Sequence, residues 1–167
     1  MFVKNDAGKK VRSYALLDGG SNRHVVSKKL CAKLGIKGEE KRMSVATLEN
    51  SIESVREISD VTVEGVNGVE INLSNAIFGN IIAAEGDAPP RDEDVTEYEH
   101  LSGVELPRFP EKSASEVDDE DDVRIGVIIG AEEARIWALG ERRVGPRDAP
   151  IGVKSALGWG LLGPKID

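Results

Sequence analysis

The 167-residue chain is 40% hydrophobic and carries a formal net charge of −8, which predicts one folded domain and argues against wholesale disorder. Its single cysteine, Cys31, excludes an internal disulfide and fits a reducing compartment. No apolar run approaches the roughly 20 residues of a membrane span and no signal-peptide segment opens the chain, so we expect a cytoplasmic protein that binds no membrane.

The first strands are expected to form a β-hairpin. Phe2–Lys4 and residues 9–17 have the apolar content of strands, and the Asn, Asp and Gly residues between them favour a tight turn. The second strand runs directly into Asp18, and the glycines after it permit a sharp reversal of the backbone that residues with a Cβ resist. The sequence therefore places a carboxylate at the mouth of a turn, at the edge of the core.

A short helix is predicted over Lys28–Leu34. Ser27 is a suitable N-cap, and Gly35 occupies the position where a left-handed residue commonly ends a helix. The apolar residues at four-residue spacing, which we expect to pack on the sheet, are Val26, Leu30 and Leu34.

Residues 42–84 show the patterns of strands. The pair Asn67-Gly68 is a strong signal for a hairpin turn between two of them. The succession of strands without intervening helices predicts an antiparallel meander. The expected strands are residues 43–48, 55–63, 70–73 and 76–84.

Residues 85–122 supply the acidity of the whole chain. They hold fifteen acidic and three basic side chains, a net charge of −12, and the remaining 129 residues have a net charge of +4. Such a segment buries little apolar area, so we expect an insertion with mobile ends, in which residues 98–109 lie along the folded body. The weak positive charge of that body does not indicate nucleic-acid binding.

The last part of the chain returns to apolar strands. Residues 123–131 have the composition of a buried strand that ends in glycine, and residues 132–139 are expected to form a short helix. Residues 151–164 predict one or two closing strands. We therefore expect a single all-β domain over residues 1–167, with one or two short helices.

The sequence lacks the residue patterns of several common functional sites. His24, His100 and Cys31 do not have metal-ligand spacing, and no glycine-rich phosphate loop with a following lysine occurs. A nucleophilic pair of Ser21 and His24 lacks the context of a nucleophile elbow. Cys31 lies in the predicted helix and is best explained as a small buried residue. We expect no metal and no cofactor.

Two stretches remain that can carry chemistry. Residues 16–21 read Leu-Leu-Asp-Gly-Gly-Ser, and residues 127–130 read Val-Ile-Ile-Gly. The simplest interpretation of the first stretch is a strand that ends in an ordinary Asp-Gly turn. Their occurrence together, with a β meander between them, favours another interpretation.

With these motifs the chain resembles the retropepsin-like aspartic peptidase domain of BEL/Pao-type retroelement polyproteins. The family's catalytic strand reads Leu-Leu-Asp-(Ser/Thr)-Gly-Ser and precedes a short helix, which residues 27–35 match. A later apolar–apolar-Gly strand is matched by residues 128–131, and residues 98–107 resemble the segment before it. The family's ending, Leu-Gly-Trp-x-Leu-x-Gly-Pro, is matched by residues 157–164.

The resemblance implies a closed acid-protease barrel and an aspartic endopeptidase that processes a retroelement polyprotein. Two aspartates about 3 Å apart share one proton and together activate a water molecule. Because the chain has one such motif, two copies must each contribute Asp18, which implies a homodimer that binds an extended polypeptide. The residues implied for the catalytic loop are Gly19, Gly20 and Ser21, and those implied to support it are Ile128, Ile129 and Gly130.

One position departs from the family, because Gly19 stands where the family has Ser or Thr. By resemblance, that hydroxyl bonds across the dimer to the partner's active-site loop. Its loss is expected to cost about 1 kcal/mol per missing hydrogen bond and to weaken the dimer and the activity. A substrate lid is expected in the hairpin near residues 45–52, which is otherwise an ordinary surface hairpin. The lid candidates are Ala46, Thr47, Leu48 and Glu49.

Two other functions stay open. The first is a catalytically weak or inactive domain on the same fold that serves dimerisation or peptide binding, with Gly19 as the mark of lost activity. The second is a monomeric β-domain whose acidic segment, residues 85–122, docks a basic partner. An acidic segment of this kind is otherwise a solvated loop.

Overall fold

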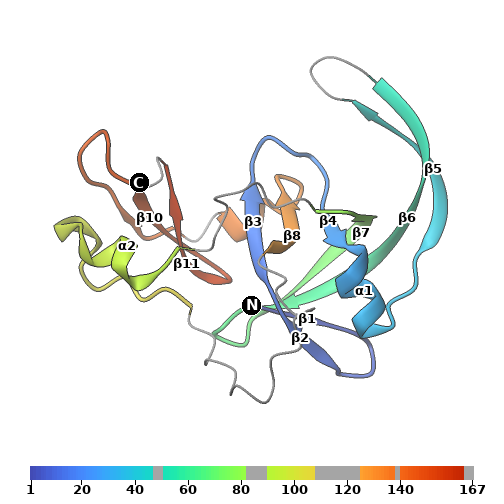
Figure 1. Ribbon diagram of the computed structural model, residues 1–167, viewed down its shortest axis with the longest axis horizontal. Coiled ribbons are helices and arrows are strands. Elements are labelled where there is room, and N and C mark those ends of the chain that lie inside the picture. The colour runs from blue at the N-terminus through green and yellow to red at the C-terminus, as the bar shows by residue number, and fades with distance from the viewer. Residues whose placement is uncertain (47–50, 82–89, 108–124, 138–139, 164–167) are drawn as a thin grey trace.

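The computed structural model describes residues 1–46, 51–81, 90–107, 125–137 and 140–163 (Figure 1). Within these ranges the fold is mostly β with few helices, as predicted. An eight-stranded sheet curls into a nearly closed barrel, and a three-stranded sheet lies beside it. No helix in the described ranges has the length and apolarity needed to cross a membrane.

The eight-stranded sheet contains β1 (Phe2–Lys4), β2 (Lys10–Arg12), β3 (Tyr14–Asp18), β4 (Val25–Ser27), β5 (Glu39–Ala46), β6 (Ser51–Glu64), β7 (Glu70–Gly79) and β8 (Ile125–Gly130). The three-stranded sheet contains β9 (Arg142–Arg143), β10 (Ile151–Ser155) and β11 (Gly158–Leu162). The helices are α1 (Lys28–Leu34), α2 (Asp92–Thr96) and α3 (Ala134–Trp137), and η1 (Glu99–Leu101) is a 3₁₀ turn.

The large sheet has the strand order β2-β1-β6-β7-β4-β8-β3, and β5 extends it by pairing with β6. The meander predicted for residues 42–84 is confirmed, because β5, β6 and β7 pair antiparallel in sequence order. The pairs that complete the barrel are different in kind: β3 runs parallel to β8, and β4 runs parallel to β7 and antiparallel to β8. These non-local pairs leave no signal in any short window of sequence.

Ser13 closes the barrel where the first hairpin ends. The predicted second strand, residues 9–17, breaks there into β2 and β3, which lie at opposite edges of the sheet. Ser13 is 2% exposed, and its N–H donates to the carbonyl of Met1 at 3.1 Å. Its Oγ accepts the buried Gly126 N–H at 3.0 Å. Ser13 thus connects the start of the chain before β1 with β8, the neighbours of the two edge strands.

The core lies between the curled sheet and α1. Leu30 and Leu34 on α1 are buried against the sheet, as the helical spacing predicts, and Cys31 is buried as expected for a small packing residue. The helix has the predicted bounds and ends at Gly35, whose φ of +66° is the expected left-handed conformation. The buried strand residues of this core include Val3, Val26, Val61, Val63, Leu73, Phe78, Val127 and Ile129.

β7 is one strand where two were expected, at residues 70–73 and 76–84. The two segments join at Asn75, which has a positive φ of 52° and donates its N–H to Asp60 Oδ1 at 2.9 Å. This bond lies beside an irregularity in the β6–β7 register. The strand therefore continues past Asn75, where the sequence suggested a break between two strands. The strand ends at Gly79, and residues 82–84 lie outside the described ranges.

The middle of the acidic segment packs on the small sheet. Leu101, Val104 and Leu106 are buried there against Trp159 and Leu161, which agrees with the expectation for residues 98–109. The sequence did not predict α2. Phe109 and the two ends of the segment lie outside the described residues.

The closing elements agree with expectation. β10 and β11 form the predicted closing strands as a hairpin. The helix expected at residues 132–139 is represented by α3, which begins at Ala134 and buries Ile136; residues 138–139 lie outside the described ranges.

Ser13→Ala is expected to lower the free energy of unfolding by about 1–3 kcal/mol, because the buried Gly126 N–H loses its acceptor. Urea unfolding measures the change. Ser102→Ala, at an exposed position, is the control and is expected to change stability by less than about 0.5 kcal/mol. Equal effects of the two substitutions would contradict the role of Ser13 in closing the barrel.

Candidate active-site loop

Asp18 is the last residue of β3 and stands in register with Gly130, the last residue of β8. Strand β3 forms because its apolar residues pair with the buried β8; Leu17 lies opposite Ile129, for example. The carboxylate therefore emerges where a parallel pair of strands ends. The side chain of Asp18 is half-buried.

The turn after Asp18 is held by the aspartate itself. Its Oδ1 accepts the Gly20 N–H at 2.9 Å, and its carbonyl accepts the Ser21 N–H at 3.2 Å. Aspartate at the first position of a tight turn commonly makes such bonds, so this geometry alone also fits an ordinary turn. A Cβ on Gly20 would lie 3.2 Å from Asp18 Oδ1, a tight contact, whereas a Cβ on Gly19 meets no described atom within 4 Å.

The segment after this turn crosses the end of β8 in close contact. The Ala131 N–H donates to the Ser21 carbonyl at 2.7 Å. A Cβ on Gly130 would lie 2.5 Å from the Arg23 carbonyl oxygen and 2.6 Å from that of Ser21, so the crossing requires glycine. Of the three residues predicted to support the loop, Gly130 touches it directly.

The other two predicted support residues, Ile128 and Ile129, do not pair with the turn itself but with neighbouring strands. Ile129 is fully buried opposite Leu17, and the half-buried Ile128 lies between Leu16 of β3 and Val25 of β4. Strand β8 thus lies between β3 and β4 in the sheet and pairs with both of them. We use the name Asp18 loop for residues 18–24.

His24, the last residue of the Asp18 loop, had no role predicted from the sequence. The side chain is 2% exposed, and its Nδ1 accepts the Gly130 N–H at 3.2 Å. Burial lowers the pKa of His24 below its usual value, while Glu132 and Glu133 act to raise it and Arg23 to lower it. The sequence offered one signal for this position: a histidine six residues after the aspartate, immediately before a short run of β-branched residues that forms β4.

The structure also bears on the pair of Ser21 and His24. Ser21 Oγ donates to the Arg23 carbonyl at 2.9 Å and accepts the Arg23 N–H at 3.2 Å. Because His24 Nδ1 accepts from Gly130, the hydroxyl and this imidazole nitrogen are engaged separately. This arrangement favours a structural role for both side chains in the loop.

Cys31 is the remaining candidate nucleophile. It is buried in α1, and burial raises the pKa of its thiol to about 12. The thiol is therefore protonated at neutral pH, as expected for a packing residue. In the described part of the chain, no three His, Cys, Asp or Glu side chains gather as metal ligands.

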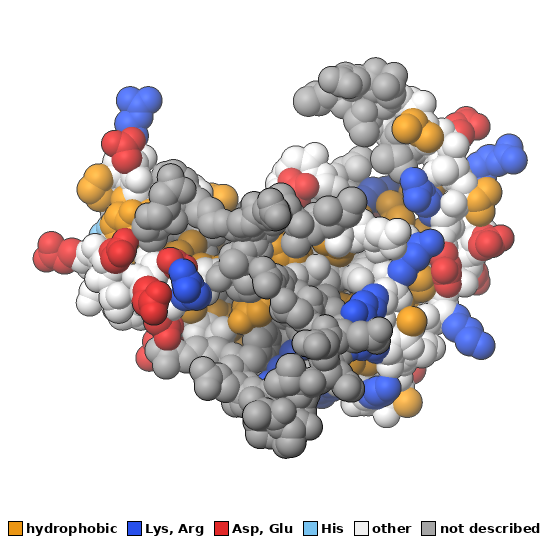
Figure 2. Space-filling model, viewed as in Figure 1, with side chains coloured by type: hydrophobic (Ala, Val, Ile, Leu, Met, Phe, Trp, Pro, Cys, Tyr) orange, Lys and Arg blue, Asp and Glu red, His pale blue; other side chains and the backbone are white. Residues whose placement is uncertain are grey.

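The lid candidates fall at the tip of the β5–β6 hairpin. Ala46 is exposed at the end of β5, and Thr47, Leu48 and Glu49 lie outside the described residues. Figure 1 shows the hairpin extending beyond the barrel, and Figure 2 shows a hollow at the same edge of the molecule, between this hairpin and the small sheet.

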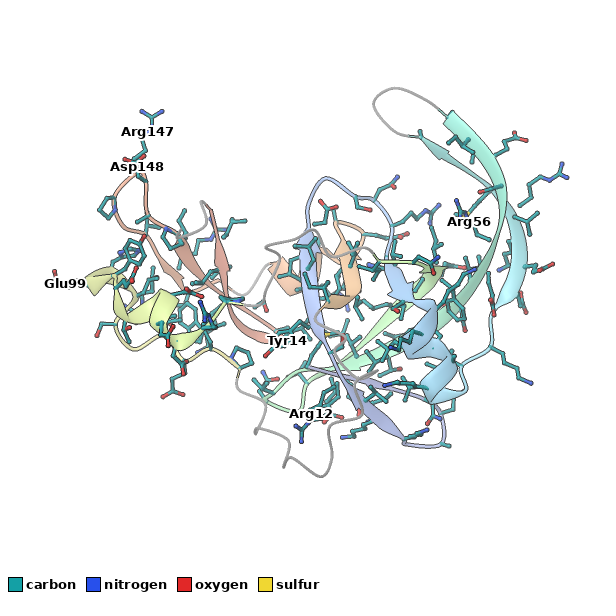
Figure 3. The ribbon with its side chains drawn as sticks, in the orientation of Figure 1. Arg12, Tyr14, Arg56, Glu99, Arg147 and Asp148 are labelled. Carbon is teal, nitrogen blue, oxygen red and sulfur yellow. The ribbon has the colours of Figure 1, made fainter. Side chains whose placement is uncertain are left out.

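The hairpin has two distinct faces. Ile52, Ser54 and Arg56 lie on the same face as the buried Ile58, because side chains alternate along a strand. Figure 3 shows Arg56 pointing inward from the hairpin, toward the barrel. Ile52 is 58% exposed, so this inner face offers apolar surface that nothing described covers.

Comparisons with protein-family models, with curated proteins and with solved structures found nothing that matches this chain.

Gly130→Ala is expected to lower the free energy of unfolding by about 1–3 kcal/mol and to displace the Asp18 loop, because the new Cβ collides with backbone atoms. Thermal unfolding measures the first effect, and amide chemical shifts of residues 18–24 measure the second. Gly19→Ala is the matched control, since its Cβ has open space, and it is expected to leave stability unchanged or slightly raised. Similar losses for both variants would contradict the close crossing.

Proposed function

We propose that this chain is a retropepsin-like aspartic endopeptidase domain that cleaves a retroelement polyprotein of the BEL/Pao type as a homodimer. The observation that supports this most is the position of Asp18, half-exposed on a glycine turn at the end of β3 and opposite Gly130 of β8. An ordinary turn needs no second strand beneath it. Here the loop crosses β8 so closely that only glycine fits.

The proposed reaction needs two carboxylates and one water molecule. One carboxylate takes a proton from the water as it attacks the peptide carbonyl, and the other donates a proton to that carbonyl oxygen. The tetrahedral diol then collapses: the dyad passes a proton to the nitrogen, takes one back from the diol hydroxyl, and the C–N bond breaks to release the amine. Two carboxylates about 3 Å apart cannot both ionise, so the pair holds one proton and supplies both roles. Each protomer contributes one Asp18, which makes dimerisation part of the mechanism.

The position of β3 is compatible with such a dimer. Among the described strands, β3 pairs only with β8 and forms one edge of the sheet. Leu16, two residues before Asp18, is 46% exposed on this edge strand. An exposed edge with apolar side chains is a surface to which a second copy can bind.

The proposed substrate is an extended polypeptide. A peptide in the hollow of Figure 2 can add as a strand beneath the β5–β6 hairpin, whose inner face presents Ile52. Closure of the hairpin excludes water from the dyad, as lids of this kind do. The mechanism uses no metal and no cofactor.

Gly19 supports a second candidate, a weak or inactive domain on the same fold that serves dimerisation or peptide binding. It lacks the hydroxyl that the resembled family places after its aspartate. Because Gly19 is exposed and a Cβ there meets no described atom, the fold has room for the missing side chain. The two candidates therefore differ in chemistry and not in fold.

Asp18→Asn is expected to abolish peptide cleavage, because an amide cannot act as the base, while the fold is retained. Cleavage of a peptide library between about pH 4 and pH 7 measures activity, and circular dichroism measures folding. Asp6→Asn, at an exposed position in the first hairpin, is the matched control and keeps full activity. Cleavage that survives Asp18→Asn would end the proposal.

Gly19→Ser is expected to tighten the dimer and to raise cleavage. Each of the two symmetry-related hydrogen bonds across the dimer is worth about 1 kcal/mol, together roughly thirtyfold in the association constant. Sedimentation equilibrium measures the association, and kcat/KM measures cleavage. Gly19→Ala is the control that adds a Cβ without the hydroxyl. An increase that is equal for Ser and Ala would show that backbone freedom, not the hydroxyl, limits the protein.

A further inference from the structure

His24 occupies the point where the pairing of β4 with β8 ends. The antiparallel register joins Val25 to Ile128 and Val26 to Val127. Beyond these pairs, the Gly130 N–H donates to the imidazole of His24 at 3.2 Å, in a buried environment. A side chain therefore accepts the hydrogen bond at the end of β8.

The backbone of His24 is fixed on the other side. Its carbonyl accepts the Ile77 N–H of β7 at 2.9 Å, so the residue is anchored to β7 through its backbone and to β8 through its ring. The Ala131 N–H bond to Ser21 is a second hydrogen bond between the Asp18 loop and this end of β8. Loss of the imidazole bond would leave the loop held by one bond fewer at Gly130, the residue opposite Asp18.

We propose that His24 is a pH-sensitive positioning residue, whose neutral imidazole holds the Asp18 loop on Gly130 and whose protonation releases it. This inference rests on the proposed function for its effect on catalysis, and on the structure alone for its effect on the loop. His24 touches neither the substrate nor the reacting atoms, and it acts only through Gly130 and the loop.

Protonation removes the bond because of the chemistry of imidazole. A neutral ring has one nitrogen that accepts, whereas both nitrogens donate in the charged ring. Protonated Nδ1 would face the Gly130 N–H donor to donor and would place a charge in a buried site. The charged groups that reach the ring are Glu132 and Glu133 after β8, which favour protonation, and Arg23 in the loop, which opposes it. Arg23 also pairs with Glu132 at 3.6 Å.

The direction of the pH effect follows from the lowered pKa of His24. The unfolded chain takes up a proton near the ordinary value of 6.5, and the folded protein does so at lower pH because burial disfavours the charged ring. The contribution of His24 to stability is therefore complete above about pH 6.5 and is lost as the pH falls through the folded pKa. The loop is held at neutral pH and freed by acid.

The direct test is hydrogen exchange of the Gly130 amide, followed by NMR in the wild-type chain between about pH 7.5 and pH 4.5. We expect protection, corrected for the intrinsic exchange rate, to fall roughly tenfold as His24 protonates. His24→Asn keeps an acceptor near the position of Nδ1 but does not titrate, so its Gly130 protection is expected to be independent of pH. His100→Asn, which removes the other histidine, is the matched control and behaves as the wild type.

Cleavage provides the second measurement. On the acid side of the profile, kcat/KM of His24→Asn is expected to fall at lower pH than that of the wild type and of His100→Asn. If His24 had only a structural role, its substitution would change the amount of folded protein but not the pH at which kcat/KM falls on the acid side. If the acid side of the kcat/KM profile is the same in a folded His24→Asn variant as in the wild type, His24 has no effect on catalysis through the loop.

The outcomes separate the two proposals. Gly130 protection that does not change with pH in the wild type overturns the role of His24, whether or not peptides are cleaved, and this measurement needs no variant to fold. Absence of cleavage by every variant, together with pH-dependent Gly130 protection, overturns the proposed function and leaves the role of His24 in the loop supported.

Discussion

The close crossing of the Asp18 loop over Gly130 is the constraint on which the candidate site depends. Strand β8 can support β3 and β4 at once only because its last residue has no side chain to separate the loop from it. The carboxylate, the glycine turn and His24 are all placed by this contact. A backbone approach of this kind resists small adjustments, since the colliding atoms belong to the main chain and not to flexible side chains.

Elements with local signals were predicted well from the sequence. Helix α1 has its expected bounds, because its apolar spacing and terminal glycine lie within one short segment. The resemblance implied that residues 128–130 support the loop after Asp18, but it did not give the parallel pairing of β3 with β8. The paired residues are more than a hundred positions apart, and no pattern in either strand selects the partner. His24 was missed for the same reason, because its role depends on Gly130.

Helix α2 begins with a recognisable helix-start pattern, which was overlooked because its acidic residues were interpreted as part of a charged insertion. Asp92, Glu93 and Asp94 occupy its first turn, where carboxylates interact favourably with the free N–H groups of a helix. Asp94 Oδ2 also accepts the Arg91 N–H at 2.6 Å. The same segment buries Leu101 in the small sheet, so removal of residues 85–122 would also expose that core. Charge substitutions distinguish an acidic docking segment from a structural one more cleanly than deletion does.

Symmetry gives the proposed role of His24 an added consequence. In the proposed dimer, the dyad needs two Asp18 loops in place at once, and in the proposed role of His24 each loop is held by its own imidazole bond to Gly130. Protonation of either histidine then disables the shared site, so the active fraction follows the square of the neutral fraction and not the neutral fraction itself. A dimer of this kind responds to acid more steeply than one titrating group allows. In the proposed dimer, the single motif that requires a partner for chemistry therefore also sharpens the expected response to pH.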